Sequence, residues 1–141
     1  MVGMLVNAFL VLASLSMGAR KVLPLAVLPS LGAIARGMLF GPFTFALVFM
    51  APFIWAGNIL LIFMVKWLFA ERKMGYFISL GLGALAKAGM LFCFAFALLQ
   101  FGLVPALFLE AMGIVQLVTA LAGGVLAFAL WKAGIRLGIA G

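Results

Sequence analysis

The sequence has no histidine, one cysteine and two acidic residues among 141. The missing histidines exclude a His-ligated haem, a zinc site that uses histidine and a Ser-His-Asp triad. The single thiol, Cys93, cannot hold an iron–sulfur cluster or close a disulfide within the chain. The only side-chain carboxylates are Glu71 and Glu110, too few to supply a proton-relay pump. No G-x-x-x-x-G-K-[ST] sequence occurs, so a P-loop for ATP is excluded. We therefore expect no catalytic residue, no metal site, no cofactor and no enzymatic activity.

Charged residues make up only 8% of the chain, whereas 70% of its residues are hydrophobic. Soluble globular proteins are about 45–50% apolar, so this composition predicts an integral membrane protein surrounded by membrane lipid. The net charge of +7 would suggest nucleic-acid binding in a soluble protein. In a membrane protein it is typical of lysine and arginine at cytoplasmic helix ends, and we expect no nucleic-acid partner.

The apolar stretches predict one transmembrane domain over residues 1–141, an all-α compact bundle of about five helices. We place the helices at about 1–19, 22–38, 52–69, 75–100 and 108–131. The apolar run after the second helix is too long for one span and is interrupted by Gly41, Pro42 and Pro52, which predicts a loop or a short re-entrant segment at about 39–51.

The basic residues indicate which way the helices run. With five crossings, they gather in the first and third turns and the C-terminal tail: Arg20, Lys21, Lys66, Arg72, Lys73, Lys132 and Arg136. The positive-inside rule then predicts a cell-membrane protein with its N-terminus outside and its C-terminus in the cytoplasm. An outside N-terminus without a cleaved signal peptide is unusual, and it suggests that a preceding helix is absent.

A few polar residues remain at membrane depth once the helix-end charges are set aside: Asn7, Arg36, Thr44, Asn58, Lys87, Gln100, Gln116 and Thr119. Such residues are costly in a bilayer and usually face the protein interior or a water-filled cavity. Lys87 is the strongest candidate for a functional residue among them, because an ammonium near the middle of a span costs about 2.5–3.5 kcal/mol on insertion scales. It either binds an anionic ligand or forms an interhelical ion pair, most simply with Glu110.

Asn58 and Arg36 each allow two interpretations, and Gln116 has one. Asn58 offers a donor and an acceptor, which suit a ligand but also join membrane helices. Gln116 is expected to face a cavity, while the small residues that follow it, such as Gly123 and Gly124, allow close helix packing. Arg36, at the outer end of the second helix, either captures an incoming carboxylate or phosphate or contacts a lipid headgroup.

Five short motifs resemble one transporter family: M-L-V-N-A-F-L-V-L-A, L-P-S-L-G-A-I-A-R-G-M-L, P-F-I-W-A-G-N, L-A-K-A-G and Q-L-V-T-A-L-A-G-G. In order and spacing they are similar to the substrate-binding S components of energy-coupling-factor transporters, in a branch sometimes labelled "iron hydrogenase". The resemblance implies a bundle, usually of six helices, that captures a small molecule from outside. It also implies a transmembrane coupling protein and two cytoplasmic ATPase subunits as partners. The resemblance also leads us to expect that the family's first helix, which often bears alanines that dock the coupling protein, is missing before Met1.

The motif positions expected near the ligand cavity of that family are occupied here by Asn7, Arg36, Asn58, Lys87 and Gln116. The leading hypothesis is therefore a ligand-binding membrane subunit of a vitamin-like or anionic small-molecule importer. The alternative is a non-catalytic membrane anchor or a quinone-contacting subunit of a hydrogenase-like redox complex, with a cleft lined by Lys87, Gln116 and aromatic residues.

Overall fold

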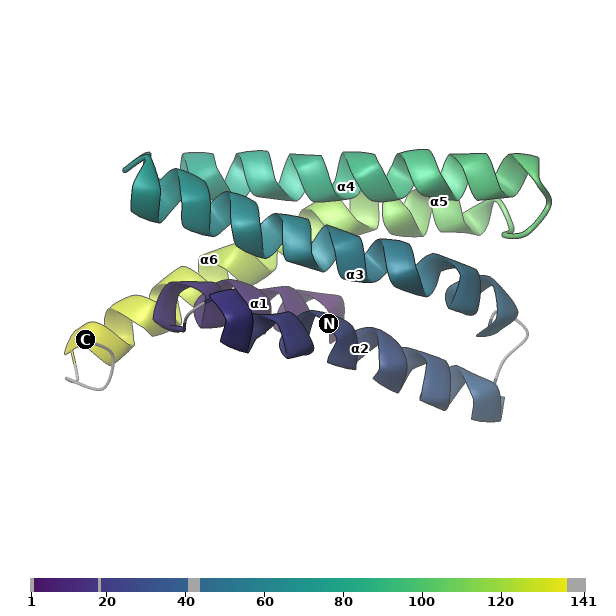
Figure 1. The fold of residues 1–141 in the computed structure, drawn as a ribbon, viewed down its shortest axis with the longest axis horizontal. Coiled ribbons are helices and arrows are strands. Elements are labelled where there is room, and N and C mark those ends of the chain that lie inside the picture. Colours follow the sequence, from purple (N-terminus) through teal and green to yellow (C-terminus); the bar gives the residue numbers. More distant parts are fainter. Residues whose placement is uncertain (1, 18, 41–43, 137–141) are drawn as a thin grey trace.

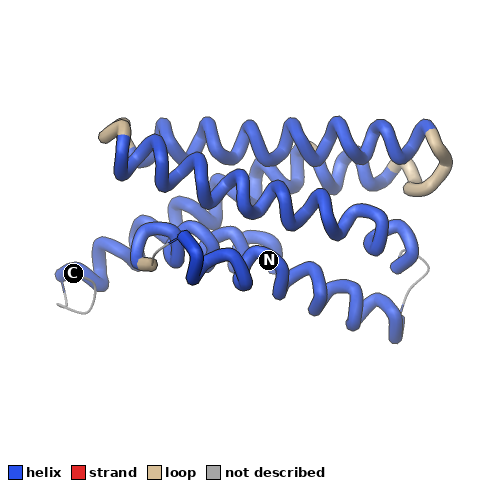
Figure 2. The backbone as a smooth tube through the Cα atoms, viewed as in Figure 1, coloured by secondary structure: helices blue, strands red, loops and turns tan. Residues whose placement is uncertain are grey.

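The computed structural model of the protein describes residues 2–17, 19–40 and 44–136, without the side chains of residues 19–20, 33–40, 44 and 136. The chain forms helices throughout (Figure 1): α1 (Val2–Ser16), α2 (Ala19–Phe40), α3 (Thr44–Lys66), the π-helical turn η1 (Trp67–Glu71), α4 (Tyr76–Gln100), α5 (Leu107–Met112) and α6 (Ile114–Arg136). Figure 2 shows only helices and short connections, with no strand in the part of the chain that is described.

Three segments are long and apolar enough to cross a membrane: Phe45–Glu71, Tyr76–Gln100 and Leu107–Ile135. Two shorter apolar segments, Val2–Ser16 and Lys21–Gly32, accompany them. Large apolar side chains such as Phe9, Phe63 and Phe77 are exposed on the outside of the bundle, as expected where lipid is the solvent. The predicted all-α membrane bundle is therefore confirmed, and the protein is membrane-embedded.

The helices form two layers. Helices α3 and α4 lie side by side along the molecule, and α5 continues into α6, which crosses behind them toward α1 and α2 (Figure 1). Helix α1 packs mainly against α6, and α2 packs mainly against α3. These contacts bring α1, α2, α3, α4 and α6 together around the centre of the bundle, where the polar residues of the candidate site lie.

Glycines let α1 and α6 approach each other closely. A Cβ atom added at Gly123 would lie 2.5 Å from the carbonyl oxygen of Met4 and 2.7 Å from the backbone nitrogen of Ala8. A Cβ atom at Gly124 would overlap the side chain of Leu80 on α4. The small-residue spacing predicted from the sequence thus lies at two helix contacts, and larger residues would force the helices apart.

The structure differs from the sequence-based expectation in residues 44–51. These residues are helical and belong to α3, which continues through Pro52, so the expected loop or re-entrant segment is wrong there. Residues 41–43 lie outside the described part of the chain. Pro52 removes one backbone donor but does not end the helix, because neighbouring elements and local adjustments tolerate proline in membrane helices.

The last predicted helix is divided, and the first is shorter than expected. Gly113 separates α5 from α6 with a non-helical ψ of −97°, and a Cβ atom there would lie only 3.0 Å from the ring of Phe92. Helix α1 has 15 residues, or about 22 Å, against about 30 Å for the hydrocarbon core. Its N-terminal end lies near the middle of the long axis in Figure 1.

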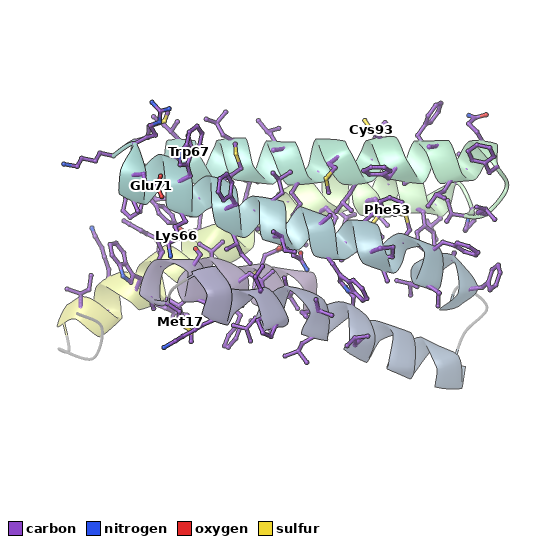
Figure 3. The ribbon with its side chains drawn as sticks, viewed as in Figure 1. Met17, Phe53, Lys66, Trp67, Glu71 and Cys93 are labelled. Carbon is purple, nitrogen blue, oxygen red and sulfur yellow. The ribbon has the colours of Figure 1, made fainter. Side chains whose placement is uncertain are left out.

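Basic side chains gather at one end of the bundle, which we call the cationic end: Lys21, Lys66, Arg72, Lys73 and Lys132. Figure 3 shows Met17, Lys66, Trp67 and Glu71 at this end, with Phe53 and Cys93 toward the other. The Lys66 ammonium donates to the carbonyl oxygen of Met17 at 3.2 Å, which ties the end of α3 to the end of α1. The Arg72 guanidinium lies 4.9 Å from the centre of the Trp67 ring.

Candidate ligand-binding site

A lysine occupies the centre of the bundle. Lys87 lies mid-way along α4, and its side chain is only 2% exposed. Two apolar clusters flank it along the helix, one that contains Leu80 and Ala84 and one that contains Leu91 and Ala95. The ammonium is therefore held in a polar centre between two apolar layers, where its burial is costly unless its N–H groups are bonded.

Two asparagines supply the bonds. The Lys87 ammonium donates to Oδ1 of Asn7 on α1 at 2.6 Å and to Oδ1 of Asn58 on α3 at 2.8 Å. Both asparagines are 2% exposed. Hydrogen bonds from an ammonium are stronger than those between neutral groups, so these contacts offset part of the cost of burial. They also bring α1, α3 and α4 together at a single nitrogen atom.

The asparagine amides extend the network to the remaining long helices. Asn58 Nδ2 donates to the carbonyl oxygen of Ala26 on α2 at 2.8 Å, in the turn where Pro29 lacks the N–H that would bond Leu25. Asn7 Nδ2 donates to the hydroxyl of Thr119 on α6 at 3.3 Å. One continuous chain of hydrogen bonds therefore joins α1, α2, α3, α4 and α6.

The absence of a side chain at Gly57 leaves room for the Lys87 side chain to cross the bundle. A Cβ atom at Gly57 on α3 would lie 3.3 Å from Cγ of Lys87 and 3.3 Å from Cδ1 of Leu91. The aliphatic stem of the lysine thus packs on the bare backbone of α3. A larger side chain at this position would press on the stem that carries the ammonium to the asparagines.

No side-chain carboxylate neutralises the charge of Lys87. The chain has only two, and both are exposed: Glu71 in η1 and Glu110 in α5. The described partners of the ammonium are amide oxygens, so the expected alternative of an ion pair with Glu110 is not what the structure shows. Amide oxygens satisfy hydrogen bonds but leave the positive charge uncompensated.

A cavity of about 200 Å³ adjoins this ammonium. Its described wall residues lie from the polar centre away from the cationic end, and every helix of the bundle except η1 contributes to them. The described lining residues are Gly3, Val6, Asn7, Pro29, Ser30, Leu47, Ile54, Asn58, Lys87, Met112 and Gln116. The wall is therefore mainly apolar, and two of its polar residues, Asn7 and Asn58, bond its one cation.

Ser30 adds an unused polar group to this wall. Its side chain is 5% exposed, and its hydroxyl has no hydrogen-bond partner among the residues that the structure describes. Buried hydroxyls nearly always have partners, because leaving one unpaired costs about 1–3 kcal/mol. An unpaired hydroxyl on a residue that shares a cavity wall with a buried cation indicates that a further polar group belongs there.

The structure brings together four of the five residues expected to surround a ligand. Asn7, Asn58, Lys87 and Gln116 line the one cavity. Arg36 belongs to α2, but its side chain lies outside the described part of the structure. Sequence reasoning did not include Ser30, because a single serine in an apolar helix carries no distinctive pattern. Thr119 was among the polar residues expected at membrane depth, but it was not one of the five predicted site residues.

The fold and the site define a helical membrane protein with a buried, uncompensated lysine that faces a small cavity. No family model, no curated protein and no solved structure matches this chain.

Proposed function

We propose that this protein is a ligand-binding membrane subunit that takes up a small molecule from the side of the bundle opposite the cationic end. One observation carries the proposal: Lys87 is buried, faces a cavity and bonds two amide oxygens, whereas the two glutamates of the chain are exposed and are not among its described partners. Intramembrane ionisable residues are expensive and usually mark a binding site or a transport path. An external ligand supplies the charge that the protein lacks.

The distribution of basic residues supports an inward direction. The cationic end would face the cytoplasm of a cell membrane by the positive-inside rule, which also places the C-terminal end of α6 there. Helix α1 then runs from the outer half of the membrane toward the cytoplasm. The cavity lies on the outer side of Lys87, where a molecule from outside would enter.

Energy for uptake would have to come from other proteins. The chain has no P-loop and too few acidic residues for a proton relay. A coupling membrane protein and cytoplasmic ATPase subunits, as in energy-coupling-factor transporters, would supply it, and this chain would bind ligand without enzymatic activity.

The redox-anchor alternative receives less support from the cavity. None of the described lining residues is aromatic, whereas the quinone hypothesis called for aromatic residues in the cleft.

The first experiment isolates the tagged protein from its own membranes in mild detergent and identifies the proteins that accompany it. A coupling protein with ATPase subunits is expected. Iron–sulfur subunits instead would overturn the proposal in favour of the redox anchor.

The second experiment asks whether the protein carries a small molecule. The purified protein is denatured, and the released molecules are compared by mass spectrometry between wild type, Lys87→Met and the control Lys66→Met. Wild type and the control are expected to release a compound that Lys87→Met lacks. The same compounds from all three would contradict a site at Lys87.

A further inference from the structure

We infer that the ligand of this site is a monoanion with a compact apolar body, most simply a small monocarboxylate, whose carboxylate lies between the ammonium of Lys87 and the hydroxyl of Ser30. This inference rests on the proposed function and names the chemical class of its ligand. It depends on four properties of the cavity: its charge, its free hydrogen-bonding groups, its wall and its volume.

The charge of the cavity specifies a single negative charge. Lys87 is the only ionisable residue among the described lining residues. One carboxylate beside it neutralises the buried ammonium, which amide oxygens cannot do. A second negative charge on the same ligand would be buried in a mainly apolar wall without a described partner, and the cost would exceed the gain.

The free polar groups of the cavity are suited to an acceptor. The ammonium has three N–H groups, and two of them point to Asn7 and Asn58. Lys87 and Ser30 both line the cavity, as does the amide-bearing Gln116, and the Ser30 hydroxyl has no hydrogen-bond partner among the described residues. A carboxylate accepts hydrogen bonds on two oxygens and donates none, so it satisfies the ammonium and the Ser30 hydroxyl at once. A neutral amide would pair with Ser30 but leave the charge uncompensated.

The wall and the volume specify the rest of the molecule. Val6, Pro29, Leu47, Ile54 and Met112 provide an apolar surface around the polar end. The cavity measures about 200 Å³. An apolar cavity of about 150 Å³ accommodates benzene, so this one holds an aromatic ring or a branched chain of similar size with its carboxylate. A chloride ion or acetate would neutralise Lys87 but leave most of this surface uncovered.

The test measures binding of benzoate to the purified protein by the shift of its unfolding temperature, in detergent and in chloride-free buffer. Four comparison compounds isolate the four properties: benzamide lacks the charge, phthalate carries two charges, and acetate and chloride lack the apolar body. We expect saturable stabilisation by benzoate, with each comparison compound binding at least ten-fold more weakly. Equal binding of any of them, or no binding of benzoate, would overturn the inference.

Variants locate the bound carboxylate. Lys87→Met is expected to abolish the benzoate shift, and Ser30→Ala to weaken binding about ten-fold. The control is Ser14→Ala, because Ser14 is equally buried but bonds the carbonyl oxygen of Val11 in its own helix. Ser30→Ala also keeps the test informative if Lys87→Met does not fold. An unchanged affinity in Ser30→Ala would overturn the proposed position of the carboxylate.

The two proposals fail in different ways. If wild type carries a Lys87-dependent compound but binds no monocarboxylate, the inference about ligand class is wrong and the binding function stands. If benzoate binds as expected but the protein isolates with iron–sulfur subunits, the site is correctly described and the import function is wrong.

Discussion

The hydrogen bond between Lys87 and Asn58 can be isolated by a double-mutant cycle. Asn58→Leu keeps the approximate volume of the side chain but removes the amide, which leaves the ammonium with Asn7 alone and Ala26 without its side-chain donor. Lys87→Met keeps an unbranched side chain of similar length but removes the charge. The double variant removes both groups that form the bond.

The structure indicates how large each effect should be. Asn58→Leu loses a hydrogen bond to a charged group, about 1.5–3 kcal/mol, and one interhelical bond to Ala26, about 0.6 kcal/mol on average in membranes. We therefore expect it to lower the free energy of unfolding by about 2–4 kcal/mol. Lys87→Met strands two amide oxygens, at a cost of about 2–6 kcal/mol, but relieves about 2.5–3.5 kcal/mol of burial cost, so its net effect should lie between a gain of about 1.5 and a loss of about 3.5 kcal/mol.

The cycle separates these terms. The double variant has no ammonium to strand, so its loss should be smaller than the sum of the single losses by the energy of the shared bond, about 1.5–3 kcal/mol. The measurement is equilibrium unfolding in mixed detergent micelles of increasing denaturing-detergent content, followed by helical circular dichroism. The unfolding samples contain neither benzoate nor its comparison compounds, so that only contacts within the protein are compared.

The matched control is Lys66 in α3, whose ammonium also has a described hydrogen bond. Lys66 lies at the cationic end, away from the polar centre, so Lys66→Met and Asn58→Leu should be additive. If Lys87→Met and Asn58→Leu are additive too, to within about 0.5 kcal/mol, the polar centre is not energetically coupled. The reasoning that the two asparagines hold the ammonium would then be refuted.

Three further outcomes are expected from the packing. Gly123→Ala places a Cβ atom against the backbone of α1 and should destabilise the protein by at least about 1–3 kcal/mol, as overpacking does. Gly89→Ala has open space and should be neutral or stabilising in the same unfolding assay; equal losses would contradict the close α1–α6 contact. Tyr76→Phe removes a 2.6 Å hydrogen bond to the carbonyl oxygen of Gly124 and should cost about 0.5–1.5 kcal/mol, and an unchanged unfolding midpoint would count against that bond. Cys93 is exposed on a membrane-crossing helix and should react in proteoliposomes with lipid-soluble but not with membrane-impermeant thiol reagents. Rapid reaction with both kinds of reagent would place this face of α4 in water.

The sequence alone was sufficient for the class of fold and for the residues worth suspecting. A hydrophobic fraction of 70% requires lipid, and in lipid a backbone must satisfy its own hydrogen bonds, so helices follow from composition. Lys87, Asn58 and Asn7 could be singled out for the same reason, because each is costly at membrane depth. The first inference depends only on the lipid solvent, and the second only on the cost of each single polar residue in that solvent.

Local signals were less reliable for helix boundaries. Pro52 and the pair Gly41-Pro42 indicated an interruption before residue 52, yet α3 runs from Thr44 through Pro52. Gly113, by contrast, carried no signal that set it apart from the other glycines, although it divides α5 from α6. Proline and glycine change local energies by a few kcal/mol at most, and the packing of neighbouring helices decides whether the helix continues.

Only the tertiary structure decided what surrounds the lysine. Asn7, Asn58 and Lys87 are separated by up to 80 positions in the chain, and their side chains meet because α1, α3 and α4 cross at one level. The carbonyl oxygen of Ala26 has no side-chain signature, and the unpaired hydroxyl of Ser30 is recognisable only once its surroundings are known. Composition indicated a costly lysine at membrane depth and left two glutamates as possible partners, and only the structure showed that its described bonds go to Asn7 and Asn58 instead. Packing determined that this charge faces a cavity, because close approach through Gly57 and Gly123 brings the helices together around it.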